Sequence, residues 1–337
     1  MKKTITEWCN NILTERQRVA MPIMTHPGIE LINASVFDAV TNGEVHFRAI
    51  NALHKKYPSA AVTMIMDLTV EAEAFGCKIN FEKNEIPTVK ERLIRSVEET
   101  EKLTIPRLTD SKRLNEYLEA ATLAVKNITD IPVFPGCIGP FSLAGRLIDM
   151  SEIMVDIYLY PDNIHQLLEK CTAFITDYIK AYKQLGADGI VMAEPAAGLL
   201  GEDECNQFSS AYIKKIVDEL QDDHFMIILH NCGHKGNLTR SMLSTGAKAL
   251  HFGNAADMKF VLENTPGNIL VMGNLDPVNV IKTGTPDYVK QETKKLLEMA
   301  KSYPNFIISS GCDIPPAVPH QNIEAFFEAV QEYNQKN

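Results

Sequence analysis

Short apolar segments alternate with amphipathic helical segments from about residue 60 to the end of this chain of 337 residues. Short apolar runs separated by helices are typical of right-handed βαβ units, which build a parallel sheet covered by helices. No repeated dinucleotide-binding fingerprint supports a doubly wound sheet. The pattern therefore predicts an α/β fold of the (β/α)₈ TIM-barrel type, with seven visible strands and an eighth hidden in the first hundred residues. The visible strands are 60–67, 131–137, 189–195, 225–232, 248–254, 268–277 and 306–312.

The first 58 residues predict a helical extension that packs on the barrel, with turns at Met21–Pro22 and His26–Pro27–Gly28. Residues 1–337 are expected to form one domain. Residues 78–88 favour a small β-hairpin, and the charged segment 89–103 that follows is expected to be a helix.

Three potential metal ligands fall where predicted strands end. His230 and Cys232 close one apolar run, and Cys312 closes another. Residues two apart on a strand point to the same side, and barrel enzymes carry their chemistry at the carboxyl ends of the strands. One imidazole and two thiols with an open fourth position form the pattern of a catalytic zinc site, because structural zinc is normally closed by four protein ligands. The alternatives are that these are satisfied structural side chains, or that His234 replaces His230 as the nitrogen ligand. A solvated loop position is the simpler expectation for His234.

Two acids also end predicted strands. Asp67 and Glu194 are candidates for acid/base work or for orienting a substrate. A carboxylate that caps the following helix is an equally good account of either residue.

Composition restricts the partners. The net charge of −10 and a pI near 5.4 argue against nucleic acid as a partner, because no basic stripe could neutralise phosphates. No window approaches eighteen consecutive apolar residues, so no membrane span is expected. The seven cysteines are an odd number without framework spacing, which fits a reducing compartment and predicts a cytoplasmic protein. Cys77, Cys137, Cys171 and Cys205 are expected to be small buried apolar residues.

Several stretches resemble the uroporphyrinogen decarboxylase family over most of the chain from about Ala60 to the end. The resemblance implies a distorted (β/α)₈ barrel. It is carried by the strand that ends at Asp67 together with 72–76 (AEAFG), 139–145 (GPFSLAG), 185–189 (LGADG) and 273–277 (GNLDP).

Within that family the sequence is similar to the zinc-dependent methylcobamide:coenzyme M methyltransferases. That branch carries zinc on a His-x-Cys pair and a later Cys, which correspond here to His230, Cys232 and Cys312. Residues 309–316 (SSGCDIPP) are also similar to that branch. The resemblance implies Zn²⁺, a methyl donor that is methylcobalamin or a corrinoid protein, and a small thiol acceptor bound to the zinc, with Asp67 and Glu194 as orienting residues.

The chain departs from the decarboxylases at several points. It lacks their arginine-rich segment before Ala60, has Arg146 where they carry a tyrosine, and has Cys312 where they carry a histidine. A substrate with many carboxylates needs fixed cations, so these differences argue against decarboxylation. The competing functions are a uroporphyrinogen decarboxylase-type lyase and a corrinoid- or tetrapyrrole-binding protein without catalysis. Some methyltransferases of the branch place an acid where this chain has Gly253–Asn254, which leaves the fourth zinc ligand open.

Overall fold

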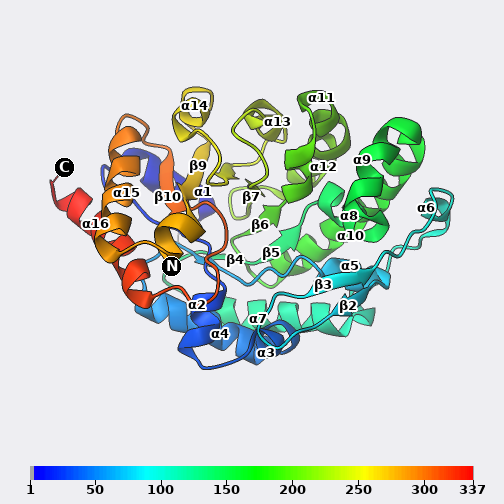
Figure 1. Cartoon of the computed structure of the whole chain (residues 1–337), viewed down its shortest axis with the longest axis horizontal. Helices are drawn as coiled ribbons and strands as arrows, with labels where there is room; N and C mark the ends of the chain where they lie inside the picture. The colour runs from blue at the N-terminus through cyan, green and yellow to red at the C-terminus, as the bar shows by residue number, and fades with distance from the viewer. Residues whose placement is uncertain (1–3, 337) are drawn as a thin grey trace.

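Parallel strands lie in the middle of the molecule and helices surround them, as the computed structural model of the chain shows for residues 4–336 (Figure 1). Six strands form one parallel sheet in the order β10-β9-β8-β7-β6-β5, and β1 pairs in parallel with β4. The strands are β1 Val62–Thr63, β4 Val133–Phe134, β5 Gly136–Ile138, β6 Gly189–Ala193, β7 Met226–Asn231, β8 Ala249–Phe252, β9 Leu270–Leu275 and β10 Phe306–Ser310.

Backbone hydrogen bonds continue around the gap between β10 and β1. The Met21 amide donates to Ile308 of β10 at 2.9 Å, and the Ala60 amide donates to Ala20 at 2.8 Å, so the segment around Ala20 lies between the two sheets. On the other side, the Asp188 amide donates to Val133 of β4. The segment around Ala20 occupies the place of the eighth strand that the sequence predicts in the first hundred residues. The (β/α)₈ fold is confirmed in a distorted form, with some very short strands.

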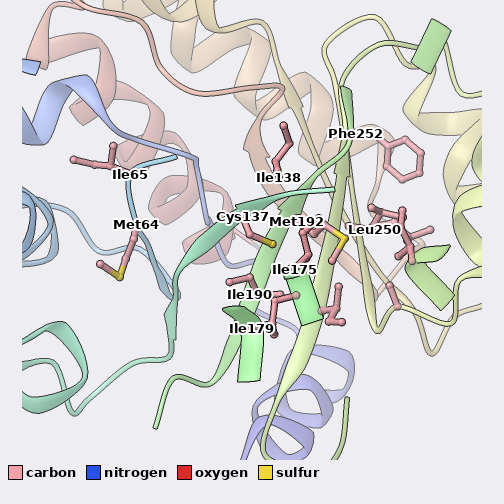
Figure 2. Close-up of a cluster of buried hydrophobic side chains, with 14 of the residues drawn as sticks. Met64, Ile65, Cys137, Ile138, Ile175, Ile179, Ile190, Met192, Leu250 and Phe252 are labelled. Atoms are coloured by element: carbon pink, nitrogen blue, oxygen red, sulfur yellow. The ribbon is translucent and has the colours of Figure 1, made fainter. Parts of the chain in front are cut away.

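The strand side chains alternate between two apolar clusters. Ile190 and Met192 of β6 pack against Ile175 and Ile179 of α10 (Pro161–Gln184), in the layer between strands and helices (Figure 2). Val191, which lies between them in sequence, belongs to a second cluster with the alternate residues of β7, β8, β9 and β10. Successive side chains of a strand point to opposite faces, so the second cluster fills the inside of the ring of strands.

Helix α1 (Ile5–Thr14) packs against this inner cluster. Ile5 and Ile12 are buried in it, and the ring of Trp8 meets the ring of Phe134 edge-on at 5.9 Å. The helix begins with a capping box between Thr4 and Glu7, which satisfies amides of its first turn. Helix α1 of the N-terminal segment therefore lies against the inner side chains of the strands.

The other helices connect or cover the strands. They are α2 His26–Leu31, α3 Val36–Thr41, α4 Gly43–Lys56, α5 Val70–Phe75, α6 Glu99–Lys102, α7 Lys112–Asn127, α8 Pro140–Ile148, α9 Met150–Leu159, α11 Glu202–Cys205, α12 Ala211–Leu220, α13 Thr239–Ser244, α14 Met258–Glu263, α15 Pro286–Met299 and α16 His320–Lys336. Within residues 4–336, none of these helices combines the length and the apolar character that crossing a bilayer requires.

The expected hairpin is present as β2 (Lys78–Asn80) and β3 (Thr88–Glu91), which pair antiparallel. The prediction of a helix over residues 89–103 is wrong. β3 takes its first residues, and the amides of Leu93 and Ile94 both donate to the Leu147 carbonyl, which keeps them out of a helix. Only α6 near its end is helical. Charge alone does not hold a helix when its amides find partners in another element.

Candidate metal centre

His230, Cys232 and Cys312 converge at the carboxyl ends of two strands. His230 lies near the end of β7, and Cys232 is the first residue beyond it; Cys312 follows β10 by two residues. One ligand atom from each residue lies within 4.8 Å of the others, and Cys312 Sγ is 4.0 Å from His230 Nε2. Ile228 belongs to the inner cluster, so alternation also places His230 inside the ring of strands.

The donor set fits a zinc ion. Zn–S bonds of about 2.3 Å and Zn–N bonds of about 2.0–2.1 Å place the ligand atoms of a tetrahedral site roughly 3.3–3.8 Å apart. The three side chains therefore need only small shifts to close on an ion. His230 is buried, whereas both cysteines are partly exposed, so the side of the cluster that carries the sulfurs is open to a further ligand.

The two thiols affect each other's ionisation. The hydrogen bond from Cys312 lowers the pKa of Cys232 to about 7, against the effect of burial. The same hydrogen bond and burial raise the pKa of Cys312 to about 12. Cys232 is therefore the thiol that ionises first, and a metal must displace the proton of Cys312.

His251 holds the far side of the His230 ring. Nδ1 of His230 lies 2.8 Å from Nδ1 of His251, and their rings meet edge-on at 4.7 Å. In the sequence, His251 is marked only by its position within the predicted strand 248–254. Its partner follows from the pairing of β7 with β8, in which His230 and His251 are directly opposite.

His234 does not join the cluster. It lies in the loop after β7, and its Nδ1 accepts hydrogen bonds from the amides of Gly236 and Leu238. The expected solvated position is wrong, because the side chain is only 4% exposed. Burial lowers the pKa of His234 to about 4.

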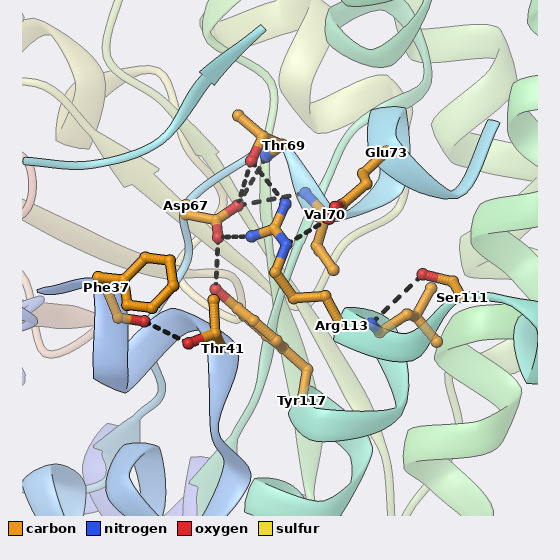
Figure 3. Close-up of polar contacts among 10 residues, drawn as sticks. Phe37, Thr41, Asp67, Thr69, Val70, Glu73, Ser111, Arg113 and Tyr117 are labelled. Carbon is orange, nitrogen blue, oxygen red and sulfur yellow. Dashed lines mark hydrogen bonds and ion pairs between the residues drawn. The ribbon is translucent and has the colours of Figure 1, made fainter. Parts of the chain in front are cut away.

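Asp67 lies in a separate buried polar cluster that involves α7 (Figure 3). Arg113 of α7 forms an ion pair with one carboxylate oxygen, and Tyr117 donates to the same oxygen at 2.7 Å. The other oxygen accepts from the amides of Thr69 and Val70. Burial works against the charge of Arg113, but the Asp67 carboxylate beside it raises the pKa of the guanidinium. Both oxygens of Asp67 are therefore engaged within the protein.

Glu194 faces the helices. Its Oε1 accepts hydrogen bonds from the amides of Phe141 and Ser142 in the first turn of α8, at 2.8 and 3.2 Å, and from the hydroxyl of Ser209. Its Oε2 has no hydrogen-bond partner within residues 4–336, and burial raises the pKa of the carboxyl to about 8. The expected alternative, a carboxylate that caps the following helix, is wrong for Glu194: its side chain makes no capping hydrogen bond to η2 (Pro195–Leu199), and it instead caps α8, which precedes it in the chain.

The sequence analysis did not identify Arg113 and Tyr117 as partners of Asp67, and it did not identify the buried Glu71 nearby. Glu71 of α5 is buried, and its Oε1 accepts from the Ile138 amide at 2.9 Å. Arg113 and Tyr117 are four residues apart on one face of an amphipathic helix, which is a usable signal for side chains that reach one site. The four cysteines expected to be buried are buried: Cys77, Cys137, Cys171 and Cys205.

Comparisons with known proteins find relatives over most of the chain. The chain is 31% identical to the methylcobamide:CoM methyltransferase MtbA of Methanosarcina acetivorans over 277 residues, which covers 81% of this chain and 80% of the relative. It is also 31% identical to MtbA of Methanosarcina mazei, with 88% and 86% covered. A uroporphyrinogen decarboxylase of Pseudoalteromonas translucida is 25% identical, with 84% and 81% covered.

The solved structure of a methyltransferase from Methanosarcina mazei superposes with a TM-score of 0.87 at 25% identity, covering 98% of this chain and 99% of that one. A B12-independent methionine synthase from Shewanella, 14% identical with a TM-score of 0.58, shares the fold. The family model for uroporphyrinogen decarboxylase (URO-D) matches residues 11–333. Together with the relatives at 31% identity, this match shows that the chain belongs to the uroporphyrinogen decarboxylase family.

Proposed function

We propose that this protein is a zinc-dependent methyltransferase that moves a methyl group from a methylated corrinoid to a small thiol. The observation that carries the proposal is the convergence of His230, Cys232 and Cys312 within 4.8 Å. The relatives at 31% identity, named as methylcobamide:CoM methyltransferases, support the same reaction class.

Zinc would supply the activation of the acceptor, because coordination deprotonates a thiol outright. In the transfer, the acceptor sulfur forms a bond to the methyl carbon, and the carbon–cobalt bond breaks with its electron pair left on cobalt. The proton of the thiol is released on binding. The donor is methylcobalamin or a corrinoid protein, and the acceptor is a small thiol.

The ligands of this chain suit that task. Cys232 and Cys312 as thiolates would offset the charge of a divalent ion, which keeps an acceptor sulfur electron-rich. His230 is fixed from behind by His251 and presents its other nitrogen to the cluster. The partly exposed cysteines leave the open side towards the acceptor.

Asp67 and Glu194 are assigned a supporting role. Asp67 anchors α7 to the segment between β1 and α5 through Arg113, and Glu194 anchors the first turn of α8 beside β6. An orienting role towards the substrate would act through these elements. The proposal treats residues 1–337 as one domain and the protein as cytoplasmic.

The test uses the purified protein, elemental analysis and a panel of small thiols with methylcobalamin. We expect about one zinc per chain, with demethylation of the corrinoid followed by its absorption spectrum and the methylated thiol identified by mass spectrometry. Cys312→Ala should lose both the zinc and the transfer. The matched control is Cys171→Ala, a buried cysteine of α10, which should keep both.

Three outcomes would overturn the proposal. Stoichiometric zinc in Cys312→Ala would contradict the ligand assignment. Decarboxylation of uroporphyrinogen that survives chelation would favour the lyase. The uroporphyrinogen decarboxylase relative at 25% identity is the reason to test this reaction. Corrinoid binding without methyl transfer to any thiol would favour a binding protein.

A further inference from the structure

A chain of hydrogen bonds leads from the proposed metal ligand to the backbone near the start of the molecule. His230 Nδ1 lies 2.8 Å from His251 Nδ1, His251 Nε2 lies 2.8 Å from Ser309 Oγ, and Ser309 Oγ donates to the Met21 carbonyl at 2.7 Å. His230, His251 and Ser309 are each at most 4% exposed. Water therefore does not compete for these contacts.

The direction of every hydrogen bond follows from the last one. A carbonyl oxygen can only accept, so the single hydroxyl hydrogen of Ser309 points to Met21. Nε2 of His251 must then donate to Ser309. A neutral imidazole has one donor and one acceptor, so Nδ1 of His251 accepts from His230. His230 thus carries its hydrogen on Nδ1, and its Nε2 has a free lone pair.

The neutral state of His251 follows from its surroundings. Within residues 4–336, no hydrogen bond or ion pair joins its ring to a carboxylate. A buried imidazolium without a paired anion is costly, so the neutral ring is favoured. The free Nε2 of His230 is the nitrogen that lies 4.0 Å from Cys312 Sγ. The chain of hydrogen bonds therefore aims a lone pair into the cluster of candidate ligands.

We propose that His251 and Ser309 are positioning residues that hold His230 in the Nδ1-protonated form, with the Met21 carbonyl as the terminal acceptor. This inference rests on the proposed function in that the free Nε2 is the metal ligand. It adds that the segment between α1 and α2 supports the metal site. Partners of this kind fix the ring orientation of a metal-bound histidine and raise its basicity, and their removal typically lowers metal affinity about 10- to 100-fold.

Two neighbouring serines provide a matched pair. Ser309 and Ser310 are both buried on β10, and each bonds the segment around Met21: Ser309 donates to the Met21 carbonyl, and Ser310 accepts from the Ile23 amide at 3.0 Å. Only Ser309 contacts His251 through its side chain. Ser309→Ala and Ser310→Ala therefore each remove one hydrogen bond between the same two segments, but only the first interrupts the chain to His230.

The first experiment needs no metal. Nitrogen-15 spectra of histidine-labelled protein, recorded after chelation, report which ring nitrogen carries the hydrogen. We expect His230 to be protonated on Nδ1 in the wild type and in Ser310→Ala, and to lose this preference in His251→Ala. A wild-type His230 protonated on Nε2 would overturn the inference, whatever the protein does with zinc.

The second experiment measures zinc affinity by competition with a chromophoric chelator and records the visible spectrum of the Co²⁺-substituted protein. His251→Ala should bind zinc about 10- to 100-fold more weakly with an altered cobalt spectrum. Ser309→Ala should show a smaller loss of the same kind, and Ser310→Ala none. His251→Gln should recover part of the affinity, because an amide can accept from His230 and donate to Ser309.

The outcomes separate the two proposals. If His251→Ala folds and binds zinc like the wild type with an unchanged cobalt spectrum, the positioning role is overturned. Equal losses in both serine variants would also overturn it, because the effect would then come from general loosening of the Met21 segment. If the wild type binds no zinc while His230 is protonated on Nδ1, the proposed function fails and the hydrogen-bond chain stands.

Discussion

The candidate metal centre lies at the ends of β7 and β10, and the Asp67 cluster lies in the segment between β1 and α5; the two differ in how completely their polar atoms are paired. In the Asp67 cluster both carboxylate oxygens are bonded, to Arg113 and Tyr117 on one side and to backbone amides on the other. In the metal centre, the side-chain partners of the two sulfurs within residues 4–336 are each other and His230, and both cysteines are partly exposed.

Under the proposed function, we infer from this difference that the metal centre carries the chemistry and that the Asp67 cluster supports the fold. A group whose bonding capacity is filled inside the protein stabilises the fold, whereas ligand atoms that face one another at a partly exposed position can take an ion. Asp67 and Glu194 both turn towards helices, and the metal centre faces the inside of the ring of strands. The following changes test that division of roles, beginning with the largest expected effect.

Removal of the metal should abolish the reaction and leave the fold. After dialysis against a strong chelator we expect methyl transfer to thiols to fall to background, and far-ultraviolet circular dichroism to be unchanged, because the three ligands contribute little of the core. Added Zn²⁺ should restore the activity, and Cys232→Ala should not respond to it. Activity that persists with less than about a tenth of a zinc per chain would contradict the assignment of the chemistry to the metal centre.

Breaking the Asp67 cluster should do the reverse. Asp67→Ala leaves Arg113 with one remaining carboxylate partner, Glu73, so we expect a loss of about 3–5 kcal/mol in the free energy of unfolding. The zinc content of the folded protein should stay at the wild-type level. Urea unfolding and elemental analysis measure the two quantities.

The exposed pair between Arg107 and Asp110 is the control for that prediction. It joins the same two residue types, but both side chains are more than half exposed. Asp110→Ala should leave stability unchanged within error, because solvent screens such a pair. If Asp67→Ala loses its zinc while it remains folded, Asp67 belongs to the metal site and the two clusters are not independent.

The sequence predicted the fold well because its signals are local and repeated. Seven apolar segments with helices between them specify parallel strands, and the ligands His230, Cys232 and Cys312 stand where those strands stop. The eighth strand position was not visible, since the segment around Ala20 forms only an isolated bridge to Ile308. Its contribution depends on contacts across nearly three hundred residues.

The residues that surround the site were also hard to predict, because their contacts join residues that are far apart in the sequence. His230 and His251, which are in contact, lie 21 residues apart in the sequence, and His251 and Ser309 lie 58 residues apart. The pairing of Asp67 with Arg113 spans 46 residues and depends on how α7 lies against β1. Side chains that meet through tertiary packing leave little trace in a local pattern.

The buried carboxyl of Glu71 makes the stability of the protein depend on pH, which can be tested. Burial raises the pKa of this carboxyl from 4.5 to about 7 in the folded protein. The folded state therefore binds the proton more tightly than the unfolded state, and the stabilisation is complete below about pH 4.5 and is lost as the pH rises through about 7. Above that pH the buried carboxylate should cost roughly 3 kcal/mol.

Glu71→Gln removes this titration. The free energy of unfolding of the wild type, measured relative to Glu71→Gln in urea at pH 5, 6, 7 and 8, should fall by roughly 3 kcal/mol across the series. Most of the fall should lie between pH 5 and 7. A difference that stays constant with pH would show that Glu71 is ionised throughout and that a nearby cation neutralises it.

Tyr117→Phe should have the smallest effect of the changes within the Asp67 cluster, because it removes one atom and keeps the ring. The hydroxyl donates to Asp67 at 2.7 Å, and the ring meets His46 edge-on at 5.0 Å. Loss of one hydrogen bond to a charged acceptor should cost about 1.5 kcal/mol. Asp67 keeps Arg113 as a partner of the same oxygen, so the carboxylate stays paired and the loss stays well below that of Asp67→Ala.

Urea unfolding of the single variants and of the double variant measures the coupling between Tyr117 and Asp67. If Asp67 is the only partner of the hydroxyl, Tyr117→Phe should cost nothing further once Asp67 is alanine. Equal costs in both backgrounds would mean that the hydroxyl stabilises the protein independently of the carboxylate.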